Sequence, residues 1–461
     1  MVHARTGRSL GIAKWVHKPR SNSPGDSGRT LHRTPKSAAR TFDAFAIAAP
    51  GVAALLADEL RALQVRIAEV SPAGVAFSAT IETLLHVNLW SRLATRVLVR
   101  VAEFTARDFA MLEKQAGRVP WSALIAPGAT LRFRVTCRKS RLYHSDAVAE
   151  RVARSAMRAV TSATVLATAR DDEQRDDEQR EEATDDPLAP PTHDRAADDA
   201  EIAQLIVVRF EHDRCTISID SSGALLHRRG WRQAVAKAPL RETLAAAMLA
   251  ACEWNGDLPL VDPFCGSGTI GIEAALRARA IAPGLGRRFA LEHWPGVDAA
   301  WVTAQRDEAR ARAQPSNGVR ILLSDRDAGA CTAARANAER AGVVADVEIE
   351  QRPISAVDLS ALGARGLVLT NPPYGLRVSE GSDLRSLYAR LGDIVRAGGV
   401  DWRLALLVPD RTLAAHTRLT FESVLRTSNG GIGVSLERSK TKPARRLNAR
   451  PAPNERDQAR K

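Results

Sequence analysis

The sequence predicts an α/β fold, and three observations support this prediction. After residue 239, short apolar segments alternate with segments of helical spacing, which is typical of a mostly parallel sheet covered by helices on both faces. Before residue 230, apolar and polar residues alternate in several short segments that are separated by turns or helices. The length of 461 residues exceeds what one hydrophobic core usually holds, so we expect two or three domains.

The first half of the chain predicts two α/β segments, 41–100 and 101–229. In 41–100 we expect strands at 42–47 and 96–101, a strand-turn-strand unit over 65–77 with its turn at 72–74, and helices at 52–63 and 81–90. In 101–229 we expect two helical pieces within 107–125, a strand at 130–137, a basic helix at 146–160 and a hairpin of strands 202–210 and 215–220.

An acidic stretch interrupts the second of these segments. Residues 171–180 repeat the five-residue sequence DDEQR, and residues 171–199 contain thirteen acidic residues and three arginines. Such a composition cannot bury enough apolar surface to offset chain entropy, so we expect 168–200 to be disordered. The hairpin that follows needs a sheet to join, and the strand 130–137 offers one. We therefore expect the acidic stretch to be an insertion within one domain.

Both ends of the chain are strongly basic. Residues 1–40 contain nine Lys or Arg residues and one acidic residue, and residues 438–461 contain nine and two. We expect a disordered basic arm and a disordered basic tail. With a net charge of +13, the chain suits a polyanionic partner such as nucleic acid, although an arginine-rich composition alone would give the same charge.

The cysteines and the hydropathy exclude several classes of protein. The five cysteines are scattered and show no paired CxxC spacing, which argues against a disulfide framework and against a zinc site. We therefore expect no metal and a reducing, cytoplasmic compartment. The sequence contains no run of about 18 apolar residues, so we expect no membrane span.

The second half of the chain, 230–437, predicts a Rossmann-like domain. We expect strands at 260–261, 320–324, 347–350, 366–370, 403–408 and 430–436, with helices at 269–279, 328–340 and 383–396.

A glycine-rich turn with the sequence DPFCGSGT, residues 262–269, follows the strand 260–261. Glycines at 266 and 268 let the backbone approach a ligand closely, and the helix that follows presents its N-terminus. Asp262 would repel a phosphate but suits the methionyl ammonium group of S-adenosyl-L-methionine. A tight turn with only a packing role is the alternative.

A second carboxylate, Asp325, directly follows the strand 320–324 and suits hydrogen bonds from both ribose hydroxyls of such a cofactor. The residues that we expect to bind the cofactor are Asp262, Phe264, Cys265, Gly266, Gly268, Thr269 and Asp325.

The sequence NPPY, residues 371–374, follows the strand 366–370 at the expected mouth of this pocket. The Asn371 side-chain oxygen and the Pro372 carbonyl can accept hydrogen bonds from an exocyclic amine and free its lone pair. The prolines hold that carbonyl rigidly, and Tyr374 can stack on the base. We expect Asn371, Pro372 and Tyr374 to be catalytic. The alternative is a proline turn with a buried tyrosine.

With these motifs in place, the chain resembles the bacterial THUMP-containing guanine-N2 RNA methyltransferases over roughly 41–437. The resemblance rests on 238–243 (APLRET), on 261–269 and on the insertion 281–294, which begins IAPGL. It implies a class I methyltransferase domain at 230–437, a THUMP RNA-binding domain at 101–229 and a ferredoxin-like domain at 41–100.

The chain departs from this family at Pro353, where an acidic residue usually meets the adenine amino group of the cofactor. The expected substitute is a backbone carbonyl or Ser355.

A dense row of donors at 131–144 resembles the central strand and loop of THUMP domains. We expect Arg138, Lys139, Arg141 and His144 to bind RNA, through phosphates and through sugar or base. A solvated charged face is the alternative for such a run.

Together these features predict a methyltransferase that modifies guanine N2 in structured RNA, with 23S rRNA as the first candidate substrate and tRNA as the second. Two alternatives stay open: an adenine-N6 DNA methyltransferase, because NPPY serves both chemistries, and a non-catalytic RNA-binding assembly factor.

Overall fold

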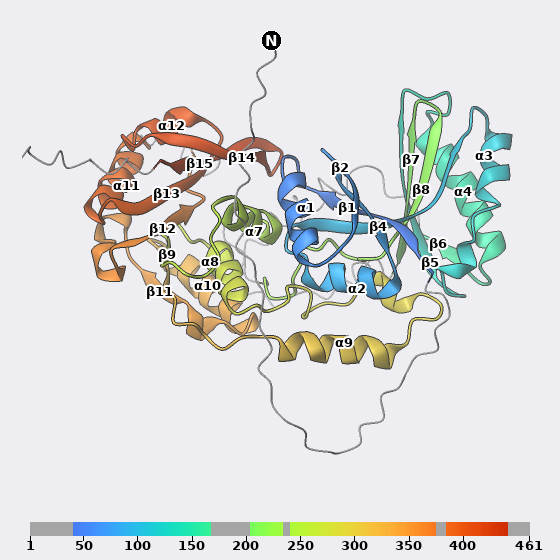
Figure 1. Cartoon of the computed structure of the whole chain (residues 1–461). Coiled ribbons are helices and arrows are strands. Elements are labelled where there is room, and N and C mark those ends of the chain that lie inside the picture. The colour runs from blue at the N-terminus through green and yellow to red at the C-terminus, as the bar shows by residue number, and fades with distance from the viewer. Residues whose placement is uncertain (1–39, 167–202, 234–239, 375–383, 441–461) are drawn as a thin grey trace, which may run out of the picture. The chain divides into compact units, whose positions relative to one another are not determined.

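The computed structural model describes residues 40–166, 203–233, 240–374 and 384–440 (Figure 1). The described residues belong to one compact unit that begins at Arg40. The predicted disorder of the basic arm, the acidic insertion and the basic tail concerns residues that lie almost entirely outside these ranges. At the tail, the last strand includes Ser439, so regular structure continues two residues beyond 437.

The first half of the chain forms one eight-stranded sheet with the order β2-β3-β1-β4-β8-β7-β5-β6. Its strands are β1 (Phe42–Ala48), β2 (Ile67–Ser71), β3 (Gly74–Ala79), β4 (Ala94–Thr105), β5 (Thr130–Arg138), β6 (Thr164–Val165), β7 (Gln204–Glu211) and β8 (Arg214–Asp220). Its helices are α1 (Ala53–Ala62), α2 (Ile81–Trp90), α3 (Phe109–Ala116) and α4 (Ser145–Ala159).

Strand β4 joins the two predicted N-terminal segments. It pairs with β1 on one side and with β8 on the other, both antiparallel. The expected domain boundary between residues 100 and 101 therefore falls inside a strand, and the sheet continues across it.

The hairpin of β7 and β8 pairs with β5, as predicted. Strands β5 and β7 run parallel from the pair Leu131–Gln204 to the pair Arg138–Glu211. The acidic stretch lies between β5 and β7 in the sequence, and these two strands are neighbours in the sheet. The predicted pairing of the hairpin with the strand 130–137 is therefore confirmed.

The second half forms a seven-stranded sheet with the order β11-β10-β9-β12-β13-β15-β14. Its strands are β9 (Leu260–Asp262), β10 (Ile321–Asp325), β11 (Glu348–Gln351), β12 (Arg365–Thr370), β13 (Asp401–Val408), β14 (Phe421–Asn429) and β15 (Ile432–Ser439). Its main helices are α7 (Glu242–Ala251), α8 (Thr269–Ala278), α9 (Ala299–Ala311), α10 (Ala328–Arg340), α11 (Arg385–Ala397) and α12 (Arg411–Ala415). Strands β9 to β13 are parallel, and β15 and β14 are antiparallel additions.

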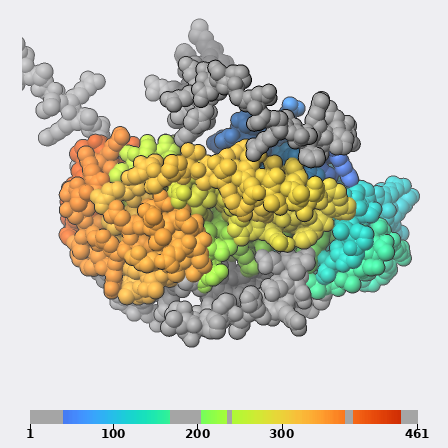
Figure 2. Space-filling model, turned by 90° about the horizontal axis from the view of Figure 1, so that it is seen from below, coloured from blue at the N-terminus to red at the C-terminus, as the bar shows by residue number. Residues whose placement is uncertain are grey.

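Four of these elements were not predicted from the sequence, among them the short helix α12. Helix α7 has eight buried residues out of ten, so it lacks the polar face on which helical periodicity depends. Helix α9 follows the insertion 281–294 and lies at the surface seen in Figure 2 (yellow). Strand β14 is mostly half-buried and has no clear alternation.

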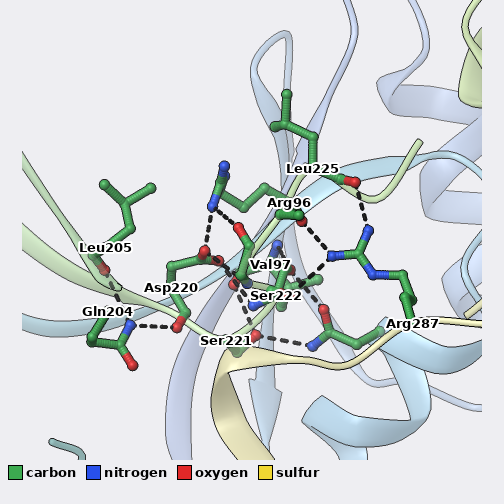
Figure 3. A network of polar contacts seen from close by, with 12 residues as sticks. Arg96, Val97, Gln204, Leu205, Asp220, Ser221, Ser222, Leu225 and Arg287 are labelled. Atoms are coloured by element: carbon green, nitrogen blue, oxygen red, sulfur yellow. Dashed lines mark hydrogen bonds and ion pairs between the residues drawn. The ribbon is translucent and has the colours of Figure 1, made fainter. Parts of the chain in front are cut away.

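The insertion 281–294 packs against the first sheet. Arg287 donates hydrogen bonds to the carbonyl oxygens of Ser222 (3.1 Å), Ala224 (2.5 Å) and Leu225 (2.5 Å) (Figure 3). The indole nitrogen of Trp294 donates to Gln204 Oε1 at 2.8 Å. The insertion thus connects the two sheets.

A buried ion cluster makes a second connection. Glu273 of helix α8 is fully buried, with Arg229 Nε 3.3 Å and Arg92 Nη1 3.7 Å from its carboxylate. Arg92 also donates to the carbonyl oxygens of Leu276 (3.1 Å) and Ile281 (2.6 Å). Because removing one partner would leave an uncompensated buried charge, this cluster holds α8 against the segment that precedes β4.

None of the described helices is long and apolar enough to cross a membrane. All five cysteines are described and carry free thiols.

Candidate active site

The carboxyl ends of three neighbouring parallel strands bring the predicted site residues together. Strand β9 lies between β10 and β12, with Asp262 opposite Leu323 and Val261 opposite Val368. Asp262, Asp325 and Asn371 therefore come from adjacent strand ends at one edge of the sheet, where open α/β sheets bind ligands.

The glycine turn after β9 depends on left-handed backbone at two positions. Gly266 has φ of +51° and Gly268 has φ of +85°, a region that favours glycine. A Cβ at Gly268 would lie 3.0 Å from the Cβ of Ala334, so glycine there also lets α10 approach closely. The backbone nitrogen of Gly266 donates to Asp325 Oδ2 at 3.1 Å, which joins this turn to β10.

Asp262 is a buried carboxylic acid that links the glycine turn to the NPPY segment. Its Oδ1 accepts hydrogen bonds from the backbone nitrogen of Phe264 (3.2 Å) and from Thr370 Oγ1 (2.5 Å). Burial raises the pKa of Asp262 to about 7, although these two hydrogen bonds favour the charged form. Among the described residues no Lys or Arg forms an ion pair with it, so a cationic ligand group would find an uncompensated carboxylate.

Asp325 is half-buried, and both of its carboxylate oxygens contact backbone nitrogens. Besides Gly266, the backbone nitrogen of Asp327 donates to it, at 3.0 Å to Oδ1. Its carbonyl oxygen accepts from the backbone nitrogen of Arg352 at 2.9 Å. The carboxylate is thus fixed at the strand end.

Around Pro353, where the family expects an acid, the short turn Ile354–Ala356 follows β11. The carbonyl oxygen of Ser355 accepts a hydrogen bond from Arg390 Nη2 at 3.0 Å and keeps a second lone pair, so a contact of Ser355 with the cofactor stays a prediction.

The remaining predicted cofactor residues support the turn by packing. Phe264 is half-buried against the core beside β12, and Thr269 begins α8 as a buried residue. Cys265 is buried, donates its backbone nitrogen to the Ser324 carbonyl at 3.0 Å and places its thiol against that of Cys331.

The NPPY segment presents a buried acceptor. Asn371 Oδ1 is inaccessible to solvent, and no group in the described part of the chain donates a hydrogen bond to it. A buried polar atom without a partner costs free energy and calls for a functional explanation. Here it would accept a hydrogen bond from a ligand amine.

Two further side chains hold this segment in place. Tyr388 of α11 is 1% exposed, and its hydroxyl donates to the Pro373 carbonyl at 3.3 Å. Burial raises the pKa of Tyr388 above its ordinary value, so the phenol stays a donor. Asn429, the last residue of β14, donates from Nδ2 to the Tyr374 hydroxyl at 3.1 Å.

The predicted RNA-binding residues lie on the first sheet, apart from the strand ends of the second. Arg138 ends β5, and Lys139, Arg141 and His144 follow it; all four side chains are exposed. Within the described ranges, no acidic side chain forms an ion pair with Arg138, Lys139 or Arg141. Tyr143, 68% exposed, lies against His144 with ring centroids 4.0 Å apart and ring planes tilted by 39°. These side chains are available to a partner.

Sequence reasoning missed Thr370, Tyr388 and Asn429. Thr370 directly precedes the NPPY segment and reaches Asp262 across the sheet. Tyr388 is a single tyrosine in an amphipathic helix and carries no local signal. The Asn429-Gly430 dipeptide is a hairpin signal that could have located the turn between β14 and β15.

Two family models match this chain. A model described as an RMKL-like methyltransferase domain matches residues 229–436, and a model of the RlmL ferredoxin-like domain matches residues 43–98.

Two relatives and one solved structure show how far the similarity extends. Ribosomal RNA large subunit methyltransferase K/L of Syntrophotalea carbinolica is 36% identical over 85% of this chain and 52% of its own length, so the chain spans about half of that relative. A candidate RNA methyltransferase of Synechocystis sp. is 30% identical over 86% of this chain and 96% of its own. A crystal structure of a candidate methyltransferase complexed with SAH is 28% identical, covers 87% of this chain and 99% of its own, and has a TM-score of 0.71.

The similarity includes both sheets and the three strand ends that form the site. The chain therefore belongs to the RMKL-like methyltransferase family.

Proposed function

We propose that this protein transfers a methyl group from S-adenosyl-L-methionine to the N2 amino group of guanine in structured RNA. We take 23S rRNA as the first candidate substrate and tRNA as the alternative. The observation that carries the proposal is the buried Asn371 Oδ1, which has no hydrogen-bond partner among the described residues and lies at the same sheet edge as Asp262 and Asp325. Relatives named as large-subunit rRNA methyltransferases support rRNA, which would place the enzyme in the cytoplasm.

The residues around the glycine turn fit this cofactor. Asp262 offers a buried carboxylate without a cationic partner among the described residues, which suits the methionyl ammonium group. Asp325, fixed by two backbone nitrogens, retains acceptor capacity for ribose hydroxyls. When bound, the cofactor supplies an electrophilic methyl group.

The NPPY segment would activate the amine. The lone pair of an aromatic exocyclic amine is delocalised into the ring, so the nitrogen is a poor nucleophile. Asn371 Oδ1 and the Pro372 carbonyl accept hydrogen bonds from the two amine protons and favour a tetrahedral nitrogen. Tyr374 stacks on the base and aligns it. The rate of methyl transfer is raised by positioning and by fixed dipoles. The attack of the amine nitrogen on the methyl group requires no general base of matched pKa.

The proposed RNA surface is the exposed end of β5 and the loop after it. Arg138, Lys139 and Arg141 would contact phosphates, and Tyr143 with His144 would offer a stacking surface for an unpaired base. We also propose that this part of the chain, 101–229, is a THUMP domain.

The raised pKa of Asp262 predicts that cofactor affinity depends on pH. Below about pH 7 the carboxyl is protonated in the free protein and cannot pair with an ammonium group. We therefore expect affinity for S-adenosyl-L-methionine to rise from about pH 6 to about pH 7.5, by up to about tenfold per pH unit. The stability of the free protein should change in the opposite sense. The pKa of Asp262 in the folded protein is raised above its ordinary value of 3.8. The stability that its protonated carboxyl contributes is therefore fully present below about pH 4 and is lost as pH rises through about 7.

Isothermal titration across this pH range measures the effect, and Asp262→Asn is the control. The amide has nearly the same shape but does not titrate, so its affinity profile should be flat. A pH dependence that persists unchanged in Asp262→Asn would assign the titration to another group.

The substrate is tested by mapping modified guanosines in rRNA and tRNA from a strain that lacks this gene. We expect one N2-methylguanosine to disappear, from 23S rRNA first. An unchanged N2-methylguanosine profile would contradict the proposal, and loss of N6-methyladenine from DNA would instead establish the DNA methyltransferase alternative. If the purified protein did not bind S-adenosyl-L-methionine, the non-catalytic alternative would stand.

A further inference from the structure

The hairpin of β14 and β15 reaches the proposed catalytic segment through Asn429. This residue ends β14 at the Asn429-Gly430-Gly431 turn, and its Nδ2 donates to the Tyr374 hydroxyl at 3.1 Å. Both side chains are half-buried. Among the described residues, Asn429 is the one that hydrogen-bonds to this hydroxyl, so it sets where the distal end of the ring lies.

Within the NPPY segment, the Tyr374 side chain is the part that needs a hydrogen bond to fix its position. Tyr388 already holds the Pro373 carbonyl, and Thr370 is held by Asp262. The proline rings restrict the backbone between them. The Tyr374 side chain still has two rotatable bonds, and a hydrogen bond at its far end fixes the plane in which it can stack on a base.

The same strand contacts the ferredoxin-like domain three residues earlier. Gly51, in the turn between β1 and α1, has φ of +75°, and a Cβ there would lie 1.9 Å from the carbonyl oxygen of Arg426. No side chain fits between that turn and β14. Figure 1 shows the end of β14 beside α1, in agreement with this contact.

Strand β14 is paired continuously with β15 between these two contacts, from Arg426, opposite Ser435, to Asn429, opposite Ile432. Three residues of extended strand span roughly 10 Å. A displacement of the strand at the Gly51 turn would therefore move the Asn429 side chain as well.

We propose that Asn429 is a positioning residue for Tyr374, and that β14 fixes this tyrosine relative to the ferredoxin-like domain. The inference deepens the proposed function and rests on it. It explains why the β1–α1 turn approaches β14 so closely, and it makes the N-terminal domain part of the alignment of the target base.

A double-mutant cycle with Asn429→Ala and Tyr374→Phe tests the first link. Tyr374→Phe keeps the stacking ring and removes only the hydroxyl, so both variants delete the same hydrogen bond. We expect each single variant to lower kcat about fivefold, the value for one net neutral hydrogen bond, and the double variant to lower kcat about fivefold as well. The KM for RNA and the affinity for S-adenosyl-L-methionine should stay near wild type.

Losses that multiply to about 25-fold in the double variant would overturn the positioning role, because the two groups would then act independently. A lower melting temperature of the single variants with unchanged kcat would also overturn the positioning role, because the contact would then be purely structural. If the wild-type protein methylates no RNA, the proposed function itself fails.

An NMR measurement checks the contact without relying on activity. The chain contains three tyrosines, so ring-labelled tyrosine gives few signals and Tyr374→Phe assigns one of them. Asn429→Ala should shift the Tyr374 signal and leave that of Tyr143 in place. An unshifted Tyr374 signal would overturn the contact whatever the enzyme does, which separates this failure from failure of the proposed function.

Gly51→Ala tests the second link, with Gly128→Ala as the matched control. Both place alanine at a similar left-handed φ (+75° and +76°), but at Gly128 the added Cβ would have no heavy atom of a described residue within 4 Å apart from its own chain neighbours. The two variants therefore share the backbone strain, and only Gly51→Ala displaces β14.

We expect Gly51→Ala to shift the Tyr374 NMR signal and to lower kcat several-fold more than Gly128→Ala does. Equal effects of the two variants on the signal and on kcat would overturn the transmission through β14. If Gly51→Ala does not fold, Leu425→Ala, which removes a side chain 3.8 Å from the same Cβ position, serves as the second variant.

Discussion

Replacing Asn371 with alanine should lower kcat by about 100-fold or more. The variant loses one of the two acceptors whose hydrogen bonds strengthen as the amine becomes tetrahedral, and the Pro372 carbonyl remains. In the free protein Asn371 Oδ1 is buried and has no donor among the described residues, so its removal should not destabilise the fold. Because cofactor and RNA contacts lie on other residues, the dissociation constants for both should stay within about twofold.

Asn371→Asp is the matched variant, since it keeps an oxygen acceptor of the same size. It should retain more activity than the alanine variant, although a buried charge has its own cost. An alanine variant with a wild-type kcat would show that the NPPY segment is a structural turn. An alanine variant that loses cofactor binding would instead move Asn371 to the cofactor site.

Replacing Asp325 with alanine should weaken S-adenosyl-L-methionine binding by roughly 1.5–3 kcal/mol, or about 10- to 150-fold. Two effects contribute: the ribose hydroxyls lose a charged acceptor, and the Gly266 nitrogen loses the carboxylate that holds the glycine turn against β10. Isothermal titration measures the change, and circular dichroism checks that the fold persists.

Asp327→Ala provides the control for this prediction. Asp327 lies two residues further, caps α10 by accepting from the Gly329 nitrogen at 2.9 Å, and is exposed. Its loss should lower stability by about 1 kcal/mol and leave cofactor affinity unchanged. Equal losses of affinity in both variants would assign the effect to the start of α10. A wild-type affinity for S-adenosyl-L-methionine in Asp325→Ala would place the ribose contact on another residue.

The site residues that lie at the ends of strands could be predicted from the sequence. Asp262, Asp325 and Asn371 each follow a buried apolar segment, and the carboxyl ends of parallel strands lie at one edge of a sheet. The order β10-β9-β12 then brings the three together, as the structure confirms. Local pattern and topology were sufficient for this much.

The contacts made across the fold were not predictable from local pattern. Asn429 reaches Tyr374 from a strand 55 residues later, and Tyr388 reaches Pro373 from α11. Strand β14 escaped prediction because it is half-buried along most of its length, so no alternation marks it. Helix α7 escaped for the opposite reason, since nearly all of it is buried.

The electrostatics of the site depend on burial, which the sequence does not give. Asp262 is recognisable as an acidic residue before the glycine turn, but its raised pKa comes from complete burial at the end of β9. The same holds for Glu273, whose position against Arg92 and Arg229 ties the helix after the glycine turn to the N-terminal half. Such a cluster is visible only in three dimensions.

The most direct test is a single-turnover reaction with the purified protein, methyl-labelled S-adenosyl-L-methionine and saturating rRNA from a strain that lacks the gene. The RNA is then digested to nucleosides, and the labelled product is identified by mass spectrometry. We expect label in N2-methylguanosine with the wild-type protein and about 100-fold slower transfer with Asn371→Ala. Label in another nucleoside, or no label with a protein that binds the cofactor, would contradict the assignment to guanine N2 in rRNA.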